Sequence, residues 1–579
     1  MVYIICFCFA VIFSIAAAVK FFSKSDNRLL LSGVGVFLSL FLLFIPIAQF
    51  DNAFNSVNSF IMSVMRVIKV FALEQDFITS DIDFGLLPEW FEIIYVLLFN
   101  ILYLIAPLLT FGFILSFLGN ITAYLRLIVS RRDKVYVFSC VNTRTLTLAE
   151  DISKKFRNAT IVFCNSEEIE INTKGHIICL KGGITEVSLS FLRFANYTTI
   201  FMADDDENLN ISNTIRFTDR IKESAGLRKR LAKRKTDDEG IDIYYFSSLK
   251  RAGTLLNGIG TSGLRIRRIN EVQSVVYNLM YNEPVIEYKN ENNEINIAVI
   301  GFGNYGEEYV KAAVWSGQHE NYKLNINIFD IQDVKSSFLV KCPELVETEN
   351  LSDKDEVSYK LKFFDETDIF KTRFENIPEM KSTSAVFIAL GDDELNFDAT
   401  LYLRECFERL KINPKIYTVL TSIGLGEKDS IDITNHKRQP YNISFILPEK
   451  IYTYENILNV ELEKMGKKMY LTWCGSTNGG TFDDFYNYEF NYRSSIAAST
   501  FWEIRKKHNQ NIEVSDKNQR LEHWRWNAYM RSEGFRYAPE RNDIAKEHHN
   551  LVPYDELDEK TKSYDAYPIM SVSKDDKKQ

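Results

Sequence analysis

The sequence predicts a fold of three parts: an α-helical transmembrane region at the amino-terminal end, two α/β Rossmann-like domains in tandem, and a small, mainly α C-terminal domain. Three observations predict it. About the first 130 residues are dominated by long apolar runs. The chain then alternates short β-branched runs with polar helical stretches, and does so twice. After about Lys464 it becomes rich in aromatic and charged residues.

The 579 residues are enough for several domains. We expect a transmembrane region over 1–132, with spans at about 3–22, 29–50 and 92–125. The predicted domains after it are a first Rossmann-like domain at 133–285, a second at 286–463, a C-terminal domain at 464–569 and a polar tail at 570–579.

Composition excludes some classes of protein. The net charge of -9 and the pI near 5.6 give no reason to expect a nucleic-acid partner. The eight cysteines are scattered and form no C-x-x-C pair, so reduced thiols in a cytosolic body fit better than a disulfide frame or a zinc site.

Basic residues near the apolar runs predict the orientation in the membrane. Because such residues favour the cytoplasmic side, the amino terminus is expected outside and the domains after residue 132 in the cytoplasm. The first run could instead be a signal peptide, but no basic region precedes its apolar core. The basic residues used are Lys20, Lys24, Arg28, Arg126, Arg131, Arg132 and Lys134.

The segment between the second and third spans is then outside. Its "FNSVNSFIMSVMRVIKVFAL" is typical of an amphipathic helix that lies on the membrane surface or dips into it, and "EQDFITSDIDF" is acidic. No T-V-G-Y-G-like filter follows this helix, so a potassium-selective pore of the familiar kind is not supported. The third run is longer than a bilayer needs, which predicts a tilt or a kink at Pro107.

The cytosolic part repeats one pattern of five strands. The fourth strands reveal the duplication, because "TTIFMADDDENLNISNTIRF" and "SAVFIALGDDELNFDATLYL" both read as strand, acidic turn, Asn and helix. The predicted strands are 134–140, 159–165, 175–182, 198–204 and 241–248 in the first copy, and 295–303, 323–330, 359–365, 384–393 and 414–422 in the second.

A glycine fingerprint follows the first strand of the second copy. In "INIAVIGFGNYGEEYV", Gly301 permits a tight turn, Gly303 lets the backbone approach a pyrophosphate, and Gly306 lets helix and strand pack closely. Asp330 ends the next strand, where an acid holds a ribose hydroxyl. The alternative is that these glycines serve packing only. The predicted ligand contacts are Gly301, Gly303, Asn304, Tyr305, Gly306, Asp330, Asp392, Asp393 and Asn396.

The first copy differs at this position. It reads "SCVNTRTLTLAEDI", with no glycine, and Asn165 replaces the acid at the end of the second strand. We therefore expect a degenerate partner or a pocket of different specificity. Near its end lies "GLRKRLAKRK", which reads as a solvated charged face or as a patch attracted to anionic lipid.

The tandem arrangement over about residues 133–450 resembles the nucleotide-binding domains of the TrkA-N and RCK family, the regulators of potassium conductance. The residues that carry this resemblance are the glycine loop and "ALGDDELNFDATLYLRE", since the family also has an acidic D-D-x-x-N turn after its fourth strand. The resemblance implies NAD(H) or another adenine nucleotide as a regulatory ligand, ion flux as the output, and a homo-oligomer.

The C-terminal domain resembles the RyR domain, the repeat named from ryanodine receptors. The resemblance covers about 465–567 and rests on a His-x-x-Trp-Asn helix ("HWRWN"), a Gly-Phe pair after it and "LVPYDEL". Trp526, Asn527 and Tyr554 are candidate ligand contacts there, and the aromatics otherwise form a core. His523, His548 and His549 lack the ligand spacing of a metal site.

These features favour a nucleotide-sensing regulator or effector in a bacterial inner (plasma) membrane, acting in potassium transport or, as the RyR-like domain implies, in antiviral defence. No catalytic residue and no metal are predicted. The chain has no G-K-[ST] phosphate loop, H-E-x-x-H or G-x-S-x-G, so we expect no enzyme. The alternatives are a membrane-anchored NAD-dependent oxidoreductase and a ligand-free scaffold.

Overall fold

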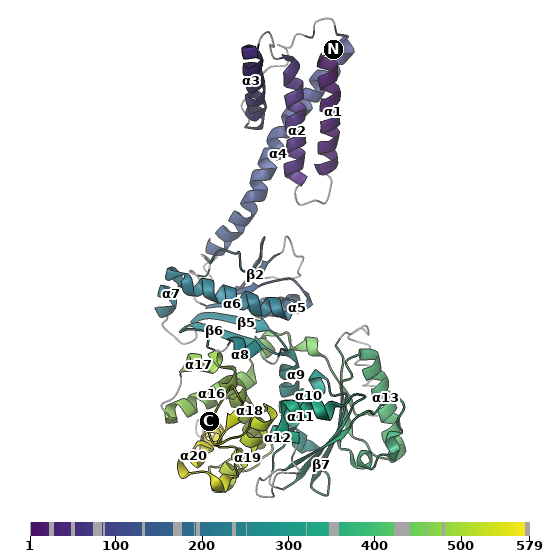
Figure 1. Ribbon diagram of the computed structural model, residues 1–579, viewed down its shortest axis with the longest axis vertical. Coiled ribbons are helices and arrows are strands. Elements are labelled where there is room, and N and C mark those ends of the chain that lie inside the picture. Colours follow the sequence, from purple (N-terminus) through teal and green to yellow (C-terminus); the bar gives the residue numbers. More distant parts are fainter. Residues whose placement is uncertain are drawn as a thin grey trace. The chain divides into compact units, whose positions relative to one another are not determined.

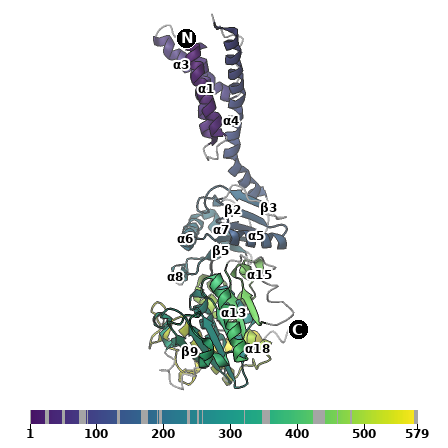
Figure 2. The same cartoon turned by 90° about the vertical axis from the view of Figure 1, so that its right-hand side faces the viewer.

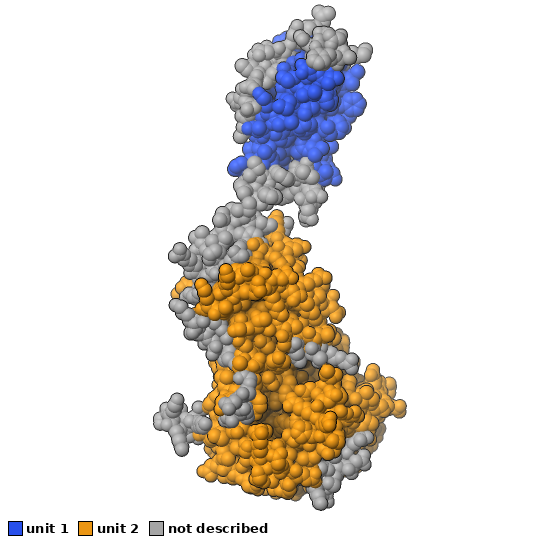
Figure 3. Space-filling view, turned by 60° about the vertical axis from the view of Figure 1, so that its left-hand side comes forward, with its two compact units in different colours: residues 1–129 blue, residues 130–579 orange. Residues whose placement is uncertain are grey.

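The structure is a computed structural model whose chain divides into two compact units, 1–129 and 130–579 (Figure 3). The described residues are 2–21, 28–47, 53–72, 84, 87–129, 134–165, 176–189, 192, 197–233, 239–249, 252–256, 258–319, 321–346, 358–421, 441–458, 460–477 and 481–573.

The first unit is helical. Its elements are α1 (Val2–Phe21), α2 (Arg28–Phe44), the 3-10 turn η1 (Ile45–Ile47), α3 (Ala53–Phe71) and α4 (Glu89–Val129). A shared apolar core includes Leu40 and Phe44 of α2 and Tyr95 and Phe99 of α4. The predicted amphipathic helix is confirmed as α3, and α4 continues unbroken through Pro107.

Among the residues of this unit that the structure describes, two helices have the length and apolar composition needed to cross a membrane, Val2–Phe21 and Glu89–Phe111. The apolar helix Leu31–Ile47 is shorter. A signal sequence or a core helix can have the same properties. The predictions that concern Lys24, Arg131 and Arg132, and the acidic segment 74–83, lie outside the described residues.

The second unit contains two parallel sheets of six strands. The first has the order β3-β2-β1-β4-β5-β6 and the second has the matching order β9-β8-β7-β10-β11-β12. Strands of both sheets are seen in Figures 1 and 2. This is the strand order of a doubly wound Rossmann fold, so the predicted duplication and its fold class are confirmed. The strands are β1 (Lys134–Phe138), β2 (Thr160–Cys164), β3 (His176–Leu180), β4 (Tyr197–Met202), β5 (Gly240–Phe246) and β6 (Leu264–Ile269); then β7 (Glu294–Ile300), β8 (Lys323–Phe329), β9 (Tyr359–Phe364), β10 (Ala385–Ile388), β11 (Lys415–Val419) and β12 (Ile443–Ile446).

Helices cover both faces of the second sheet. Successive side chains of β7 point to opposite faces and pack into a separate apolar core on each face. Ile297 and Val299 pack with the helix α10 (Asn304–Ser316). Ala298 and Ile300 pack on the other face with α13 (Asp393–Leu410). In the first copy the corresponding helices are α5 (Thr143–Lys155) and α6 (Glu207–Glu223), followed by the short α7 (Ala225–Ala232).

The basic run "GLRKRLAKRK" forms most of α7. Leu227 and Leu231 are buried against the domain, and Arg230 donates to the carbonyl of Leu192. Arg228 and Lys229 are exposed, which is compatible with a solvated charged face and with a patch attracted to anionic lipid. Residues 234–235 lie outside the described part of the chain.

The C-terminal helices share a core with the second Rossmann copy. Tyr529 of α19 (Asp516–Ser532) meets the ring of Trp315 in α10 edge to face at 6.5 Å. The predicted boundary at residue 464 falls inside α16 (Glu461–Thr477). The other elements here are α17 (Phe482–Asn487), α18 (Glu489–Lys507), β13 (Arg536–Tyr537), β14 (Glu547–His548), α20 (Glu559–Tyr564) and α21 (Ala566–Ser573). In the chain, α8 (Ala252–Leu256) connects β5 with β6, and α9 (Glu271–Asn282) follows β6.

Candidate functional site

The glycine loop of the second copy is the tight turn that the sequence predicts. Gly301 has a φ of +86°, and a Cβ at this position would lie 2.4 Å from the carbonyl oxygen of Ala389. A Cβ at Gly306 would lie 2.1 Å from the carbonyl oxygen of Gly301. Both positions therefore require glycine, one for its conformation and for space, the other for helix–strand packing.

Gly303 has a different role because space is open around it. A Cβ here would meet nothing within 4 Å, and the backbone is in an ordinary extended region with φ −70° and ψ −159°. Gly303 is the N-cap of α10, and no side chain caps that helix. The first N–H groups of α10 have no intrahelical partner, and the helix dipole makes this end attractive to an anion.

Asp330 lies at the end of β8, beside this loop. One of its carboxylate oxygens accepts the backbone N–H of Phe302 at 2.7 Å, and the other accepts that of Gln332 at 2.9 Å. The carboxylate is half-buried. An ionised carboxylate has about four lone-pair sites, so it can hold the loop and still accept a ribose hydroxyl.

In the first copy, a side chain caps the start of the corresponding helix. Asn142 is the N-cap of α5 and thus the counterpart of Gly303. Its Oδ1 accepts the N–H of Thr145 at 3.0 Å, and its Nδ2 donates to the carbonyl of Ala203 at 2.7 Å. Thr145, the counterpart of Gly306, completes a capping box by accepting the N–H of Asn142 at 2.9 Å. The helix end that is open in the second copy is already satisfied in the first.

The side chain of Asn396, in the acidic turn, makes its hydrogen bonds with the protein backbone. Its Oδ1 accepts the N–H of Leu390 at 2.6 Å and its Nδ2 donates to the carbonyl of Val419 at 2.8 Å. Asn210 makes the same two kinds of contact in the first copy, with Asp204 and Phe246 at 2.7 and 3.0 Å. The side chain joins the ends of neighbouring strands, and only 2% of Asn396 is exposed.

The two acids of this turn are also tied to the fold. Asp392 is the N-cap of α13 and accepts the N–H of Leu395 at 2.9 Å. Asp393 accepts the N–H and the hydroxyl of Thr421 at 2.7 and 3.1 Å. Asp392 remains exposed beside Gly391, at the strand end next to the glycine loop. Of the three predicted contacts in the turn, it is the one best placed to meet a ligand.

We predict that Asn396→Ala destabilises the protein instead of acting on ligand binding. The change leaves the N–H of Leu390 and the carbonyl of Val419 buried without partners, and each such group costs about 1–3 kcal/mol. A lower unfolding midpoint at unchanged nucleotide affinity is the expected result. An unchanged midpoint with lost affinity would make Asn396 a ligand contact.

Tyr305, one residue inside α10, connects the glycine loop with the first copy. Its hydroxyl donates to Glu271 of α9 at 3.0 Å. Tyr452 donates to the same carboxylate, and Arg144 of α5 lies 3.9 Å from it. Burial and the Glu271 carboxylate raise the pKa of Tyr305, so the hydroxyl stays protonated as a donor. Because Arg144 is the counterpart of Tyr305, the helix starts of both copies meet at Glu271.

The candidate contacts of the C-terminal domain gather around one loop. Asn527 donates to the carbonyl of Val552 at 3.3 Å, and a ring nitrogen of His523 lies 2.8 Å from the same oxygen. Trp526 stacks against His523, with ring centroids 5.8 Å apart, and Tyr554 lies 5.9 Å from the same ring. Asn527 and Tyr554 are buried, so these aromatics form a packed cluster. The described residues contain no group of three His, Cys, Asp or Glu that could hold a metal ion.

His548, whose ring lies 5.0 Å from that of Trp526, makes stability depend on pH. Burial lowers its pKa from 6.5 to about 4, and the nearby Arg541 and His549 act in the same direction. Its folded-state pKa lies below the unfolded value, so the unfolded chain binds more protons in this range and stability falls as the pH drops from about 6.5 to about 4. Unfolding midpoints measured across this range should fall less steeply in His548→Gln. An equal slope would show that other groups carry the effect.

Sequence reasoning missed the arginines of β6. This strand carries Arg265, Arg267 and Arg268, and the first two reach the fully buried Asp242 of β5, at 2.5 and 3.3 Å. Tyr197 also donates to Asp242, at 2.5 Å. The alternation in "LRIRRI" is the signal that could have identified a strand, although its charges favour an exposed segment.

No family model and no curated protein matches the chain. Among solved structures it is similar to a subunit of dipicolinate synthase from Bacillus halodurans, with 9% sequence identity and a TM-score of 0.20, over 54% of this chain and 90% of that one. A likeness this distant carries no argument about function. The assignment of two Rossmann-like domains rests on the strand order of the two sheets.

Proposed function

We propose that the chain is a membrane-embedded regulator or effector that binds a nucleotide at the glycine loop of its second Rossmann copy. The difference between the two copies carries this proposal. Gly303 leaves the start of α10 open, whereas Asn142 closes the same position in α5. A loop kept only for packing would have no need of an open, uncapped helix end.

The proposed ligand is NAD(H) or another adenine nucleotide. Phosphates would meet the N–H groups at Gly303 and Asn304, and a ribose hydroxyl would donate to Asp330. Ile331 follows Asp330 and is 63% exposed, so an apolar surface for a base adjoins the ribose position. The RyR-like domain is proposed to respond to ligand binding, because it shares an apolar core with α10, the helix that would bind the phosphates.

The proposed output is control of ion flux or of membrane integrity, in potassium transport or in antiviral defence. We assign the helices of the first unit to a bacterial inner membrane, with the amino terminus outside and the Rossmann-like domains in the cytoplasm. One helix, α4, contains the apolar segment Glu89–Phe111 and runs on to Val129, and β1 begins at Lys134. A short linker after a long helix is suited to passing a movement of the domains to the membrane part. A homo-oligomer is proposed from the RCK resemblance.

A flux assay tests this function. Purified full-length protein in potassium-loaded liposomes would be exposed to NAD, NADH, ATP, ADP and ADP-ribose in turn. We expect one of them to change the rate of ion or dye release. If no nucleotide changes release, the regulator model is wrong. Hydride transfer from bound NADH to an added metabolite would instead favour the oxidoreductase, and oligomers without any nucleotide binding would favour the scaffold.

A further inference from the structure

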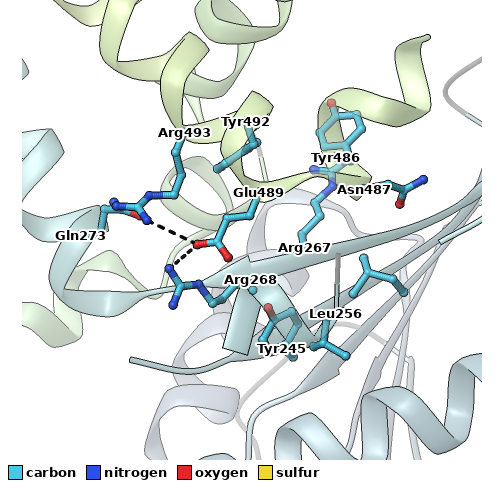
Figure 4. A pocket seen from close by; sticks show the side chains of 12 residues that line it. Tyr245, Leu256, Arg267, Arg268, Gln273, Tyr486, Asn487, Glu489, Tyr492 and Arg493 are labelled. Carbon is cyan, nitrogen blue, oxygen red and sulfur yellow. Dashed lines mark hydrogen bonds and ion pairs between the residues drawn. The ribbon is translucent and has the colours of Figure 1, made fainter. Parts of the chain in front are cut away.

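A cavity separates the edge of the first sheet from the C-terminal helices. Its lining comes from β6, α8 and α9 on one side and from α17 and α18 on the other. Figure 4 shows Arg267, Arg268 and Arg493 around it, with Glu489 between the last two. Its lining includes none of the predicted ligand contacts of the glycine loop.

Glu489 holds two arginines of this cavity. Its Oε1 pairs with Arg268 of β6 and lies 3.7 Å from Arg493 of its own helix. Its other oxygen lies against Gly253, where an added Cβ would be 1.3 Å away. A carboxylate between two guanidinium groups, next to a glycine that makes room for it, occupies a position that suits an anion.

Both arginines have further contacts that keep them in place. Arg493 is 2.5 Å from Glu533 and 3.9 Å from Glu308, and Arg268 donates to the carbonyl of Leu249 at 2.9 Å. If the Glu489 side chain moves away, these contacts therefore still hold Arg268 and Arg493 in place, and the two guanidinium groups lose part of their negative counter-charge.

A second cavity adjoins the first and shares its three arginines. No carboxylate of the described residues lines it, although Arg267 is paired with Asp242 and Glu463 behind the lining. Its volume is about 60 Å³. Amides and hydroxyls stand beside an apolar floor; the lining includes Gln273, Ser274, Asn278, Asn456, Ile457 and Val460.

We propose that the two cavities and the arginines they share, here called the arginine joint, form a second binding site. Its ligand is a small phosphate-bearing molecule that displaces Glu489 from Arg268 and Arg493. Phosphate pairs with arginine more strongly than a carboxylate does, because it carries more charge and more acceptor oxygens. Since Glu489 begins α18 and Arg268 belongs to the first sheet, the displacement breaks an ion pair that joins the first domain to the C-terminal helices.

This mechanism predicts the sign of a mutational effect. If Glu489 competes with the ligand, Glu489→Gln should tighten anion binding about tenfold or more, although it removes an ion pair. Gly253→Ala should act in the same direction, because the new methyl group displaces the flexible end of Glu489. Adding Arg268→Gln to Glu489→Gln should cancel the gain.

The experiment is a calorimetric titration of full-length protein with inorganic pyrophosphate. All variants carry Gly303→Asn, so the glycine loop contributes no phosphate site and the result is independent of the proposed function. Glu513→Gln, an exposed acid outside the cavity lining, is the matched charge control and should leave the affinity unchanged. If neither Glu489→Gln nor Gly253→Ala tightens binding, or if Arg268→Gln leaves the gain intact, the second site is refuted.

Discussion

Gly303→Asn is expected to lower nucleotide affinity about a hundredfold or more while the protein stays folded. The new side chain can adopt the arrangement of Asn142 in the first copy, which accepts the N–H of the third helical residue and fills the space in front of the helix. It would then occupy the N–H groups and the volume that a phosphate needs. Binding measured by calorimetry on full-length protein, together with the unfolding midpoint, checks both parts of this prediction.

Gly183→Asn provides the matched control for that variant. Gly183 belongs to the first copy, and a Cβ there also meets nothing within 4 Å. This substitution should change neither the affinity nor the midpoint. Retained binding in Gly303→Asn would show that the nucleotide does not use the start of α10.

Asp242→Asn is expected to reduce stability by about 3–5 kcal/mol, the usual effect of removing one partner from a buried ion pair. Asp242 is fully buried and faces Arg265 and Arg267, so an amide of the same shape removes the negative charge that both guanidinium groups share, although Arg267 keeps Glu463 at 2.8 Å. Burial alone would raise the pKa of Asp242, but the two arginines lower it, and the group stays ionised at neutral pH.

Denaturant unfolding of the purified protein measures this loss. Asp555→Asn is the control, because Asp555 binds Arg520 through two contacts of 2.7 and 2.9 Å yet is 73% exposed. Exposed pairs contribute about 0–1 kcal/mol, so its effect should be small. Equal losses in both variants would contradict the account of the buried cluster.

The glycine loop is predictable because its physical requirements appear directly in the sequence. A residue with positive φ and a close helix–strand contact leave few choices other than glycine, and Gly301 and Gly306 meet these two needs. The five strands of each copy are predictable for a similar reason, since strands buried on both faces read as apolar runs. Sequence reasoning misses the sixth strands, β6 and β12: one carries three arginines and the other is short.

The roles of polar residues are harder to predict. The position of Asn396 after a strand end predicts a ligand contact, yet its amide is used to join two strands. From the sequence, Asn142 indicates only that the first copy lacks a glycine at this position. In the structure, the capping contacts of Asn142 are the clearest difference between the two copies. In both cases the type of residue permits either role, and only the positions of distant backbone groups decide between them. The arginine joint depends on contacts over more than 220 residues, which no local pattern reveals.

The number of nucleotides bound per chain tests the central claim most directly. Full-length protein in detergent would be titrated calorimetrically with the nucleotide that gives the largest thermal shift. In protein that carries Arg268→Gln, so that the arginine site does not contribute, we predict one site per chain that disappears in Gly303→Asn and persists in the double variant Asn142→Ala, Gly183→Asn. Two equal sites per chain, or a site unaffected by Gly303→Asn, would contradict the assignment of ligand binding to the second Rossmann copy.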